Sequence, residues 1–170
     1  MFCSFVHSKD LLTEEIHPID IVETLAERRE WDFDRIADDQ IAMAVEGAWQ
    51  TYSLSLAWSA HDETLRLICT FEMQPPEEKL PELALLLDKA NDLIWTGCFN
   101  LWPDQGLMVF RYGLTLAGEA TPTPEQIDAM LKGAVMAAEQ FYPAFQLVAW
   151  GDDTADQALS IAMSEAVGRA

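Results

Sequence analysis

The chain has 170 residues, about the length of one ordinary domain, and half of them are hydrophobic, so it can bury one large core. Its 10 Lys and Arg against 29 Asp and Glu give a formal net charge of −19. This excess of acid disfavours binding to nucleic acid or to anionic lipid, because both need Lys and Arg to neutralise phosphates. We therefore expect neither nucleic acid nor a membrane as a partner.

Signals for disulfides, secretion and membrane insertion are weak. The three cysteines, Cys3, Cys69 and Cys98, form no CxxC pair and leave one over, which favours a reducing compartment. The first nine residues contain no basic segment and no uninterrupted apolar segment, both of which a secretory signal needs. The longest strongly apolar stretch, residues 83–87, is far shorter than the roughly 20 residues that span a bilayer. We expect a cytoplasmic protein.

The first half of the chain predicts one helix followed by four strands. Apolar residues recur at helical spacing from residue 13 or 18 to residue 29, and Pro18 suits a first-turn position. Four runs with alternating side chains follow, separated by polar turns at residues 38–39 and 61–63. Their apolar positions are Trp31, Phe33, Ile41, Met43, Val45, Tyr52, Leu54, Leu56, Trp58, Leu65, Leu67, Cys69, Phe71 and Met73. This alternation is typical of an antiparallel sheet with one face on the core and one face toward water.

A second helix and a hairpin are predicted next. The helix follows the two prolines at residues 75–76, runs to about Trp95 and has Gly97 as its stop. A short strand over residues 98–102, a polar turn and a long strand over residues 108–116 then predict a hairpin.

The last long helix has the strongest start signal in the chain. Thr123 can cap it, Pro124 takes the first helical position, and Gln126 can reach back to the N–H of the capping residue. Its buried stripe is predicted to be Ile127, Met130, Leu131, Ala134, Ala138 and Phe141. Because Pro143 has no N–H for the carbonyl of Glu139, we expect a kink or a break there.

These elements predict a single α+β domain with the order helix, strands, helix, strands, helix and a mainly antiparallel sheet. We place the domain at residues 18–150, with a lead-in over residues 1–17. A C-terminal tail over residues 151–170 has a weaker helical pattern between residues 154 and 167.

Catalytic patterns are missing from the sequence. Asp32 and Asp34 share one face of a predicted strand, but a solvated surface explains them better than a pair of catalytic carboxylates. No GxSxG, GxGxxG or GxxxxGK[ST] pattern occurs. Cys69 is expected to be buried and inert, and nothing near Cys98 is expected to lower its pKa. We expect no catalytic residue and no cofactor.

Metal-binding patterns are equally weak. The three histidines, His7, His17 and His61, lack the short spacing that zinc ligands need. Asp152, Asp153 and Asp156 resemble fragments of a calcium loop, but the central Gly and terminal Glu of such a loop are missing. A cap by Asp152 or Asp153 at the last helix is the simpler interpretation. We expect no metal ligand.

The six tryptophans are the most unusual feature of the composition. Trp58 and Trp95 are expected to fill the core. Trp49 and Trp102 lie near ends of predicted strands, where a tryptophan can also anchor a protein partner, since this residue is enriched at interface hot spots. We take Trp49 and Trp102 as candidate partner-binding residues.

Several short segments also carry a family resemblance over roughly residues 18–150. They are Trp31-Asp32-Phe33, the strand from Gln50 to Trp58, Leu65-Arg66-Leu67, Asn91-Asp92-Leu93-Ile94-Trp95-Thr96-Gly97, Asn100-Leu101-Trp102, Met108-Val109-Phe110-Arg111-Tyr112 and Phe141-Tyr142-Pro143-Ala144-Phe145. In these the chain resembles the YbjN-like family, bacterial proteins described as sensory transduction regulators and similar in fold to type III secretion chaperones. The resemblance implies a small acidic protein that binds other proteins and works as a homodimer, and it transfers no catalytic residue.

The sequence and the resemblance lead to one functional hypothesis and one alternative. The hypothesis is a non-enzymatic protein-binding module, chaperone-like or regulatory, which acts as a homodimer and captures a polypeptide on its sheet or in a helix groove. The alternative is an enzyme or small-ligand-binding protein whose site no sequence motif marks. A structural subunit that docks through its tail after Gly151 is a weaker third reading.

Overall fold

The computed structural model describes residues 16–168, so the predicted lead-in lies outside the described residues up to residue 15. In chain order the elements are α1 (Pro18–Arg28), β1 (Asp32–Ala37), β2 (Gln40–Glu46), β3 (Thr51–Ser59), β4 (Thr64–Glu72), the 3-10 helix η1 (Glu77–Lys79), α2 (Leu80–Asp92), β5 (Cys98–Trp102), β6 (Leu107–Thr115), α3 (Pro124–Ala149) and α4 (Ala155–Gly168). They form a single α+β unit, and the predicted order of helices and strands is confirmed.

All six strands belong to one antiparallel sheet with the order β1-β2-β3-β4-β6-β5. The first four strands form a meander, in which each strand pairs with the next. The chain then leaves the sheet for α2, returns as the edge strand β5, and turns back as β6 to pair with β4. The predicted hairpin is therefore present, and its second strand completes the centre of the sheet.

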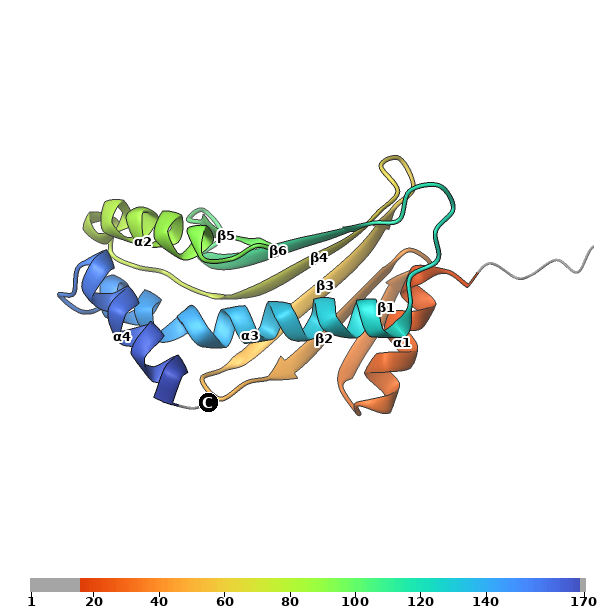
Figure 1. Ribbon diagram of the computed structural model, residues 1–170, viewed down its shortest axis with the longest axis horizontal. Coiled ribbons are helices and arrows are strands. Elements are labelled where there is room, and N and C mark those ends of the chain that lie inside the picture. Colours follow the sequence, from red (N-terminus) through yellow and green to blue (C-terminus); the bar gives the residue numbers. More distant parts are fainter. Residues whose placement is uncertain (1–15, 169–170) are drawn as a thin grey trace, which may run out of the picture.

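The sheet has one covered face and one open face. Buried side chains such as Leu54, Leu67 and Phe110 share the covered face, against which the helices pack. The opposite surface, which we call the open face, carries Ser53, Ser55, Arg66 and Arg111. Figure 1 shows α3 lying across the sheet, with α1 beside β1 at one end and α2 and α4 at the other end. The predicted division into a core face and a solvent face is confirmed.

Aromatic side chains fill the core where α3 meets the central and edge strands. Phe99 of β5 packs edge-on against Phe110, Phe141 and Phe145, with ring centroids 5.0 to 5.6 Å apart. Edge-to-face contacts of this kind add stabilisation beyond the area they bury. This cluster fixes the position of α3 on the sheet.

The N-terminus of α3 forms as the sequence predicts. The hydroxyl oxygen of Thr123 accepts the N–H of Gln126 at 3.1 Å, and the Gln126 side chain accepts the N–H of Thr123 at 2.9 Å. All six residues of the predicted stripe are buried. The helix continues through Pro143 to Ala149, so the proline does not break it. Within residues 16–168 no helix combines the length and the apolarity that a membrane crossing requires.

Two predictions about α2 are wrong. The helix ends at Asp92, three residues before Trp95, and Gly97 is not its stop. Gly97 instead lies against the sheet, where a Cβ would be 2.5 Å from the Phe110 ring and 2.6 Å from the carbonyl oxygen of Arg111. Trp95 is 99% exposed rather than part of the core, because the chain has already left the helix when it reaches this residue.

The segment in which the sequence predicts a terminal helix forms α4, which packs against α3 and α2. Its cap is Thr154 and not Asp152 or Asp153. The Thr154 hydroxyl oxygen accepts the N–H of Gln157, and the Gln157 side chain accepts the N–H of Thr154. Glu82 of α2 adds a bond by accepting the N–H of Ala155 at 2.6 Å. A carboxylate from another helix thus satisfies one of the free donors at the start of α4.

Candidate functional site

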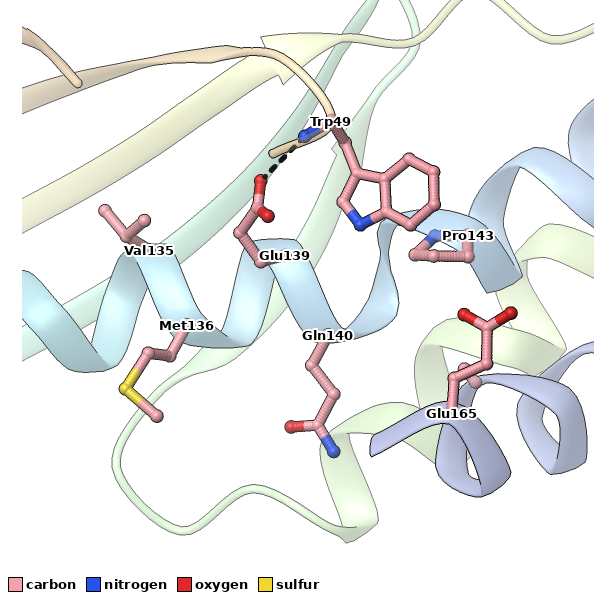
Figure 2. Close-up of a pocket in the computed structure, with 8 residues that line it drawn as sticks. Trp49, Val135, Met136, Glu139, Gln140, Pro143 and Glu165 are labelled. Carbon is pink, nitrogen blue, oxygen red and sulfur yellow. Dashed lines mark hydrogen bonds between the residues drawn. The ribbon is translucent and has the colours of Figure 1, made fainter. Parts of the chain in front are cut away.

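A groove runs between α3, α4 and the turn that joins β2 to β3. We call it the α3–α4 groove, and its volume is about 340 Å³. Its lining residues are Trp49, Val135, Met136, Glu139, Gln140, Pro143, Ala162 and Glu165. Figure 2 shows Trp49 above Pro143, while Glu165 projects from α4 toward α3. Most of the lining is apolar, which is the usual character of a recognition surface.

Glu139 holds the β2–β3 turn against α3. Its carboxylate accepts the backbone N–H of Trp49 at 3.3 Å (Figure 2). It also accepts the backbone N–H of Ala48 at 3.0 Å and the hydroxyl of Tyr52 at 2.6 Å. Hydrogen bonds to an ionised acceptor are roughly twice as strong as neutral ones. These three bonds fix the turn, and with it the backbone of Trp49.

Gly47 makes this contact possible. A Cβ at this position would lie 2.2 Å from a Glu139 oxygen and 2.5 Å from the Tyr52 ring. The Gly47 N–H also donates to the carbonyl of Gln50 at 2.8 Å, which closes the turn. The turn therefore approaches α3 closely only because residue 47 has no side chain.

The Trp49 ring rests on an aromatic chain that leads into the core. Its centroid lies 6.3 Å from that of Tyr142, whose ring in turn packs edge-on against Phe71 at 5.4 Å. Trp49 is still 42% exposed, and Met136, one turn before Gln140 on α3, is 68% exposed. An indole on a rigid support beside a flexible thioether is a combination that suits contact with apolar side chains.

Polar atoms in the α3–α4 groove are mainly hydrogen-bond acceptors. Pro143 has no N–H, so it donates no hydrogen bond to the carbonyl of Glu139 one turn earlier on α3. Glu165 adds an exposed carboxylate, and the side chains that line the groove include no Lys or Arg. The groove thus combines apolar surface with negative charge.

Trp102, the second candidate residue, lies elsewhere. It lines a hollow of about 830 Å³ on the open face, together with residues of β4, β5 and β6. The two hollows share no residue, and the structure does not bring Trp49 and Trp102 together. Trp102 is half-buried, whereas Trp49 is more exposed.

The other residues that the sequence singled out do not converge. Asp32 and Asp34 are exposed on the edge strand β1, and His61 is exposed in a turn. His17 caps α1 by accepting the N–H of Ile19 at 3.2 Å. Among residues 16–168 no group of three His, Cys, Asp or Glu side chains is placed to hold a metal ion, and His7 lies outside these residues.

The two side chains with the largest pKa shifts are buried and held in their neutral forms. Burial raises the pKa of the Cys69 thiol to about 12. Burial, together with the hydrogen bond to Glu139, raises the pKa of Tyr52 well above its ordinary value. A nucleophile or a general acid–base group needs a pKa near the working pH, so neither shift prepares the residue for catalysis.

Sequence reasoning missed Glu139 and Met136. Both lie on the side of α3 away from the predicted buried stripe, where a helical pattern only indicates solvent. The one sequence signal that could have drawn attention to them is the pair Met136 and Pro143. Both are apolar residues outside the buried stripe, so they indicate a second apolar surface on α3.

Comparison with known proteins identifies relatives. Residues 18–147 match the model of the YbjN family, described as "Putative bacterial sensory transduction regulator". Among solved structures, the fold is similar to the crystal structure of YbjN, "a putative transcription regulator from E. coli", with a TM-score of 0.52. The two chains are 13% identical, and the match covers 73% of this chain and 90% of that chain. No curated protein sequence matches the chain significantly.

Proposed function

The chain belongs to the YbjN family, described as a family of bacterial regulators, and from this premise we propose that it is a non-enzymatic, chaperone-like regulator that binds another protein. The α3–α4 groove is the proposed binding site. The observation that carries the proposal is the apolar lining of this groove, with Trp49 and Met136 exposed on a rigid support. We place its action in the cytoplasm, in keeping with the free thiols of Cys69 and Cys98.

The proposed partner is an amphipathic helix that carries Lys or Arg. A groove between two helices accepts a third helix through apolar side chains that recur every three or four residues. Glu165 then accepts a hydrogen bond from a cation at the edge of that helix. The net charge of −19 favours the encounter with a basic segment over that with an acidic one.

The proposal treats the protein as non-enzymatic for two reasons. The family description names a regulator and no reaction. The buried titratable groups Cys69 and Tyr52 stay neutral at physiological pH, so they supply neither a thiolate nor a phenolate.

A homodimer is the second part of the proposal. Leu93 and Trp95, which follow α2, are 52% and 99% exposed. Exposed apolar side chains of this size are favourable to bury against another subunit. Light scattering is expected to give twice the chain mass of 19.1 kDa at micromolar concentration. Trp95→Ser should halve that mass, and Trp150→Ser, which removes another exposed indole, should leave it unchanged. A single-chain mass for the wild type at every concentration contradicts the dimer.

Site-specific photo-crosslinking tests the groove. A benzoylphenylalanine replaces Met136 in the full chain, which is then expressed in its own organism and irradiated. The matched control carries the same group at position 85, because Leu85 is also an exposed apolar residue but lies on α2. We expect a protein adduct at position 136 that is missing at position 85, and Glu165→Lys should weaken it.

Two results would overturn the groove as a partner site. One is the same set of adducts at positions 136 and 85, because the contacts would then be non-specific. The other is an adduct at position 136 that contains only a second copy of this chain, since the groove would then be a dimer interface. If a specific adduct at position 136 is unaffected by Glu165→Lys, the groove remains the binding site, but the proposal that the partner carries Lys or Arg is wrong.

A further inference from the structure

The open face of the sheet carries a second hollow whose chemistry differs from that of the α3–α4 groove. Its side chains come from neighbouring strands in register, because Ile68 of β4 and Cys98 of β5 flank Arg111 of β6. The hollow measures about 830 Å³, large enough for a small organic molecule. We call it the open-face hollow, and its features do not depend on the proposed function.

Arg111 is unusual for a cation in so acidic a chain. The described part of the chain contains eight Lys and Arg residues, and six of them contact a carboxylate. Within these residues Arg111 and Arg28 have no ion pair, and Arg111 lines the open-face hollow. An exposed guanidinium presents a planar set of donors that matches carboxylate and phosphate groups. Arg111 is therefore available to an anion from outside the chain.

Arg66 places a second guanidinium on the same surface. Arg66 lies opposite Gly113 of β6, and Gly113 is two residues from Arg111. The two arginines therefore occupy diagonal positions on neighbouring strands, with their Cα atoms about 7 Å apart. Gly113 and, on β3, Ala57 flank Arg66 and leave the space above the strands open. Arg66 pairs with Asp62 at 2.5 Å, but both side chains are about half exposed, and such a pair contributes little stability. An incoming anion can therefore replace the Asp62 carboxylate as the partner of Arg66.

Trp102 supplies a flat apolar surface in the same hollow. Trp102 lies four residues after Cys98 on β5 and on the same face of the sheet. Because Cys98 is paired with Arg111, Trp102 is about 13 Å from Arg111 along the strand direction. A ligand that reaches both must therefore carry its charge at one end and a ring at the other. Indole rings stack on planar aromatic or heterocyclic groups, and each such contact is worth about 1–3 kcal/mol in nucleotide recognition.

We propose that the open-face hollow binds a small organic anion whose phosphate or carboxylate group contacts Arg111 and Arg66 and whose ring stacks on Trp102. The arginines provide charge-assisted hydrogen bonds, and the tryptophan selects a ligand with a ring over a simple inorganic anion. The net charge of the chain opposes anions, so binding depends on these local contacts. Salt screens the attraction between the exposed arginines and the anion and should weaken this local contribution.

Nuclear magnetic resonance of the full chain in low salt tests this site. Three probes are added separately: inorganic phosphate, adenosine 5′-monophosphate and indole-3-acetate. We expect saturable shifts of the Arg111 Nε–H with all anions that bind, and of the Trp102 indole N–H only with the two that carry a ring. The comparison between the ring phosphate and the ring carboxylate identifies the preferred head group.

Matched variants locate the site. Arg111→Gln should weaken binding at least about tenfold, since a charge-assisted hydrogen bond contributes more than the 1.4 kcal/mol that corresponds to this factor. Arg28→Gln makes the same change in net charge on α1 and should leave binding unchanged. Trp102→Leu should weaken the binding of the ring-bearing anions alone, whereas Trp150→Leu, at another exposed indole outside the hollow, should have no effect. The proposal fails if neither ring-bearing anion shifts Arg111, or if Arg28→Gln weakens binding as much as Arg111→Gln.

Discussion

The Tyr52 hydroxyl donates a hydrogen bond of 2.6 Å to Oε1 of Glu139, a residue 87 positions later in the chain. The same carboxylate accepts the backbone N–H groups of Ala48 and Trp49. One side chain of α3 therefore connects the helix to both the β2–β3 turn and strand β3. The shape of the α3–α4 groove depends on this connection, because Trp49 forms part of its wall.

Tyr52→Phe removes the hydroxyl and should lower the free energy of unfolding at pH 7 by about 1–3 kcal/mol. The pKa of Tyr52 is raised in the folded protein, chiefly by burial. Its contribution is therefore complete below the unfolded-state pKa of about 10 and is lost as pH rises above that value. Urea unfolding should show a larger loss of stability between pH 9 and pH 11 for the wild type than for Tyr52→Phe. Equal losses would contradict this assignment.

Gly47→Ala should destabilise the protein and loosen the turn. The added methyl group would lie 2.2 Å from Glu139, so the carboxylate must move and give up its bonds to the turn, at a cost on the order of 1–3 kcal/mol. Thermal unfolding measures this change. Gly133→Ala on α3 is the matched control, because no atom lies within 4 Å of the added group and alanine favours a helix by about 0.5–1 kcal/mol. Its melting temperature should rise.

Asp128→Asn should remove two ion pairs on α3. Asp128 contacts Lys132 at 2.8 Å and Arg29, the residue that follows α1. These cations hold the pKa of Asp128 below its ordinary value, with the Lys132 hydrogen bond as the largest cause. Because the pKa is lowered by folding, the stabilisation is present above the unfolded-state pKa of about 3.9 and is lost as pH falls through the folded-state pKa.

The variant should therefore be less stable than the wild type by about 0.5–1 kcal/mol at pH 7. The difference should shrink toward pH 3, and denaturant unfolding across that range measures it. A constant difference between pH 7 and pH 3 would mean that the charge of Asp128 is not the cause.

The cysteines should differ sharply in reactivity. Cys69 is fully buried and its thiol pKa is about 12, whereas Cys98 is half-buried on the edge strand β5. Because the thiolate is the reactive form, iodoacetamide at pH 8 should modify Cys69 at least roughly 100-fold more slowly than Cys98. Peptide mapping by mass spectrometry gives both rates, and in urea the two should become equal. Rapid modification of Cys69 in the native protein would show that this part of the core opens.

Much of the fold follows from local patterns. Alternation placed the strand faces, since one face of each strand is buried and the other meets water. The cap at Thr123 marked the start of α3, because its partner Gln126 is only three residues away. Local patterns failed at the end of α2, where apolar residues continue the helical spacing past Asp92 although the chain turns toward β5.

The candidate sites were harder to predict for a physical reason. Trp49 and Trp102 could be chosen from the sequence, but their surroundings come from residues far away in the chain. Glu139 acts on a turn 90 residues before it, and no spacing rule links such positions. The arginine pair on the open face depends on the register of β4 and β6, which the sequence alone leaves open.

The side chain of Asn91 bonds both backbone groups of Phe99, with its amide nitrogen 3.0 Å from the carbonyl oxygen and its oxygen 2.7 Å from the N–H. The two ends of the intervening segment are thereby clamped together, while Trp95 at its tip makes little contact with the rest of the fold. An epitope or a fluorescent label inserted beside Trp95 should consequently leave the fold intact. A bulky group at this tip should therefore obstruct the proposed dimer while each single chain keeps its fold.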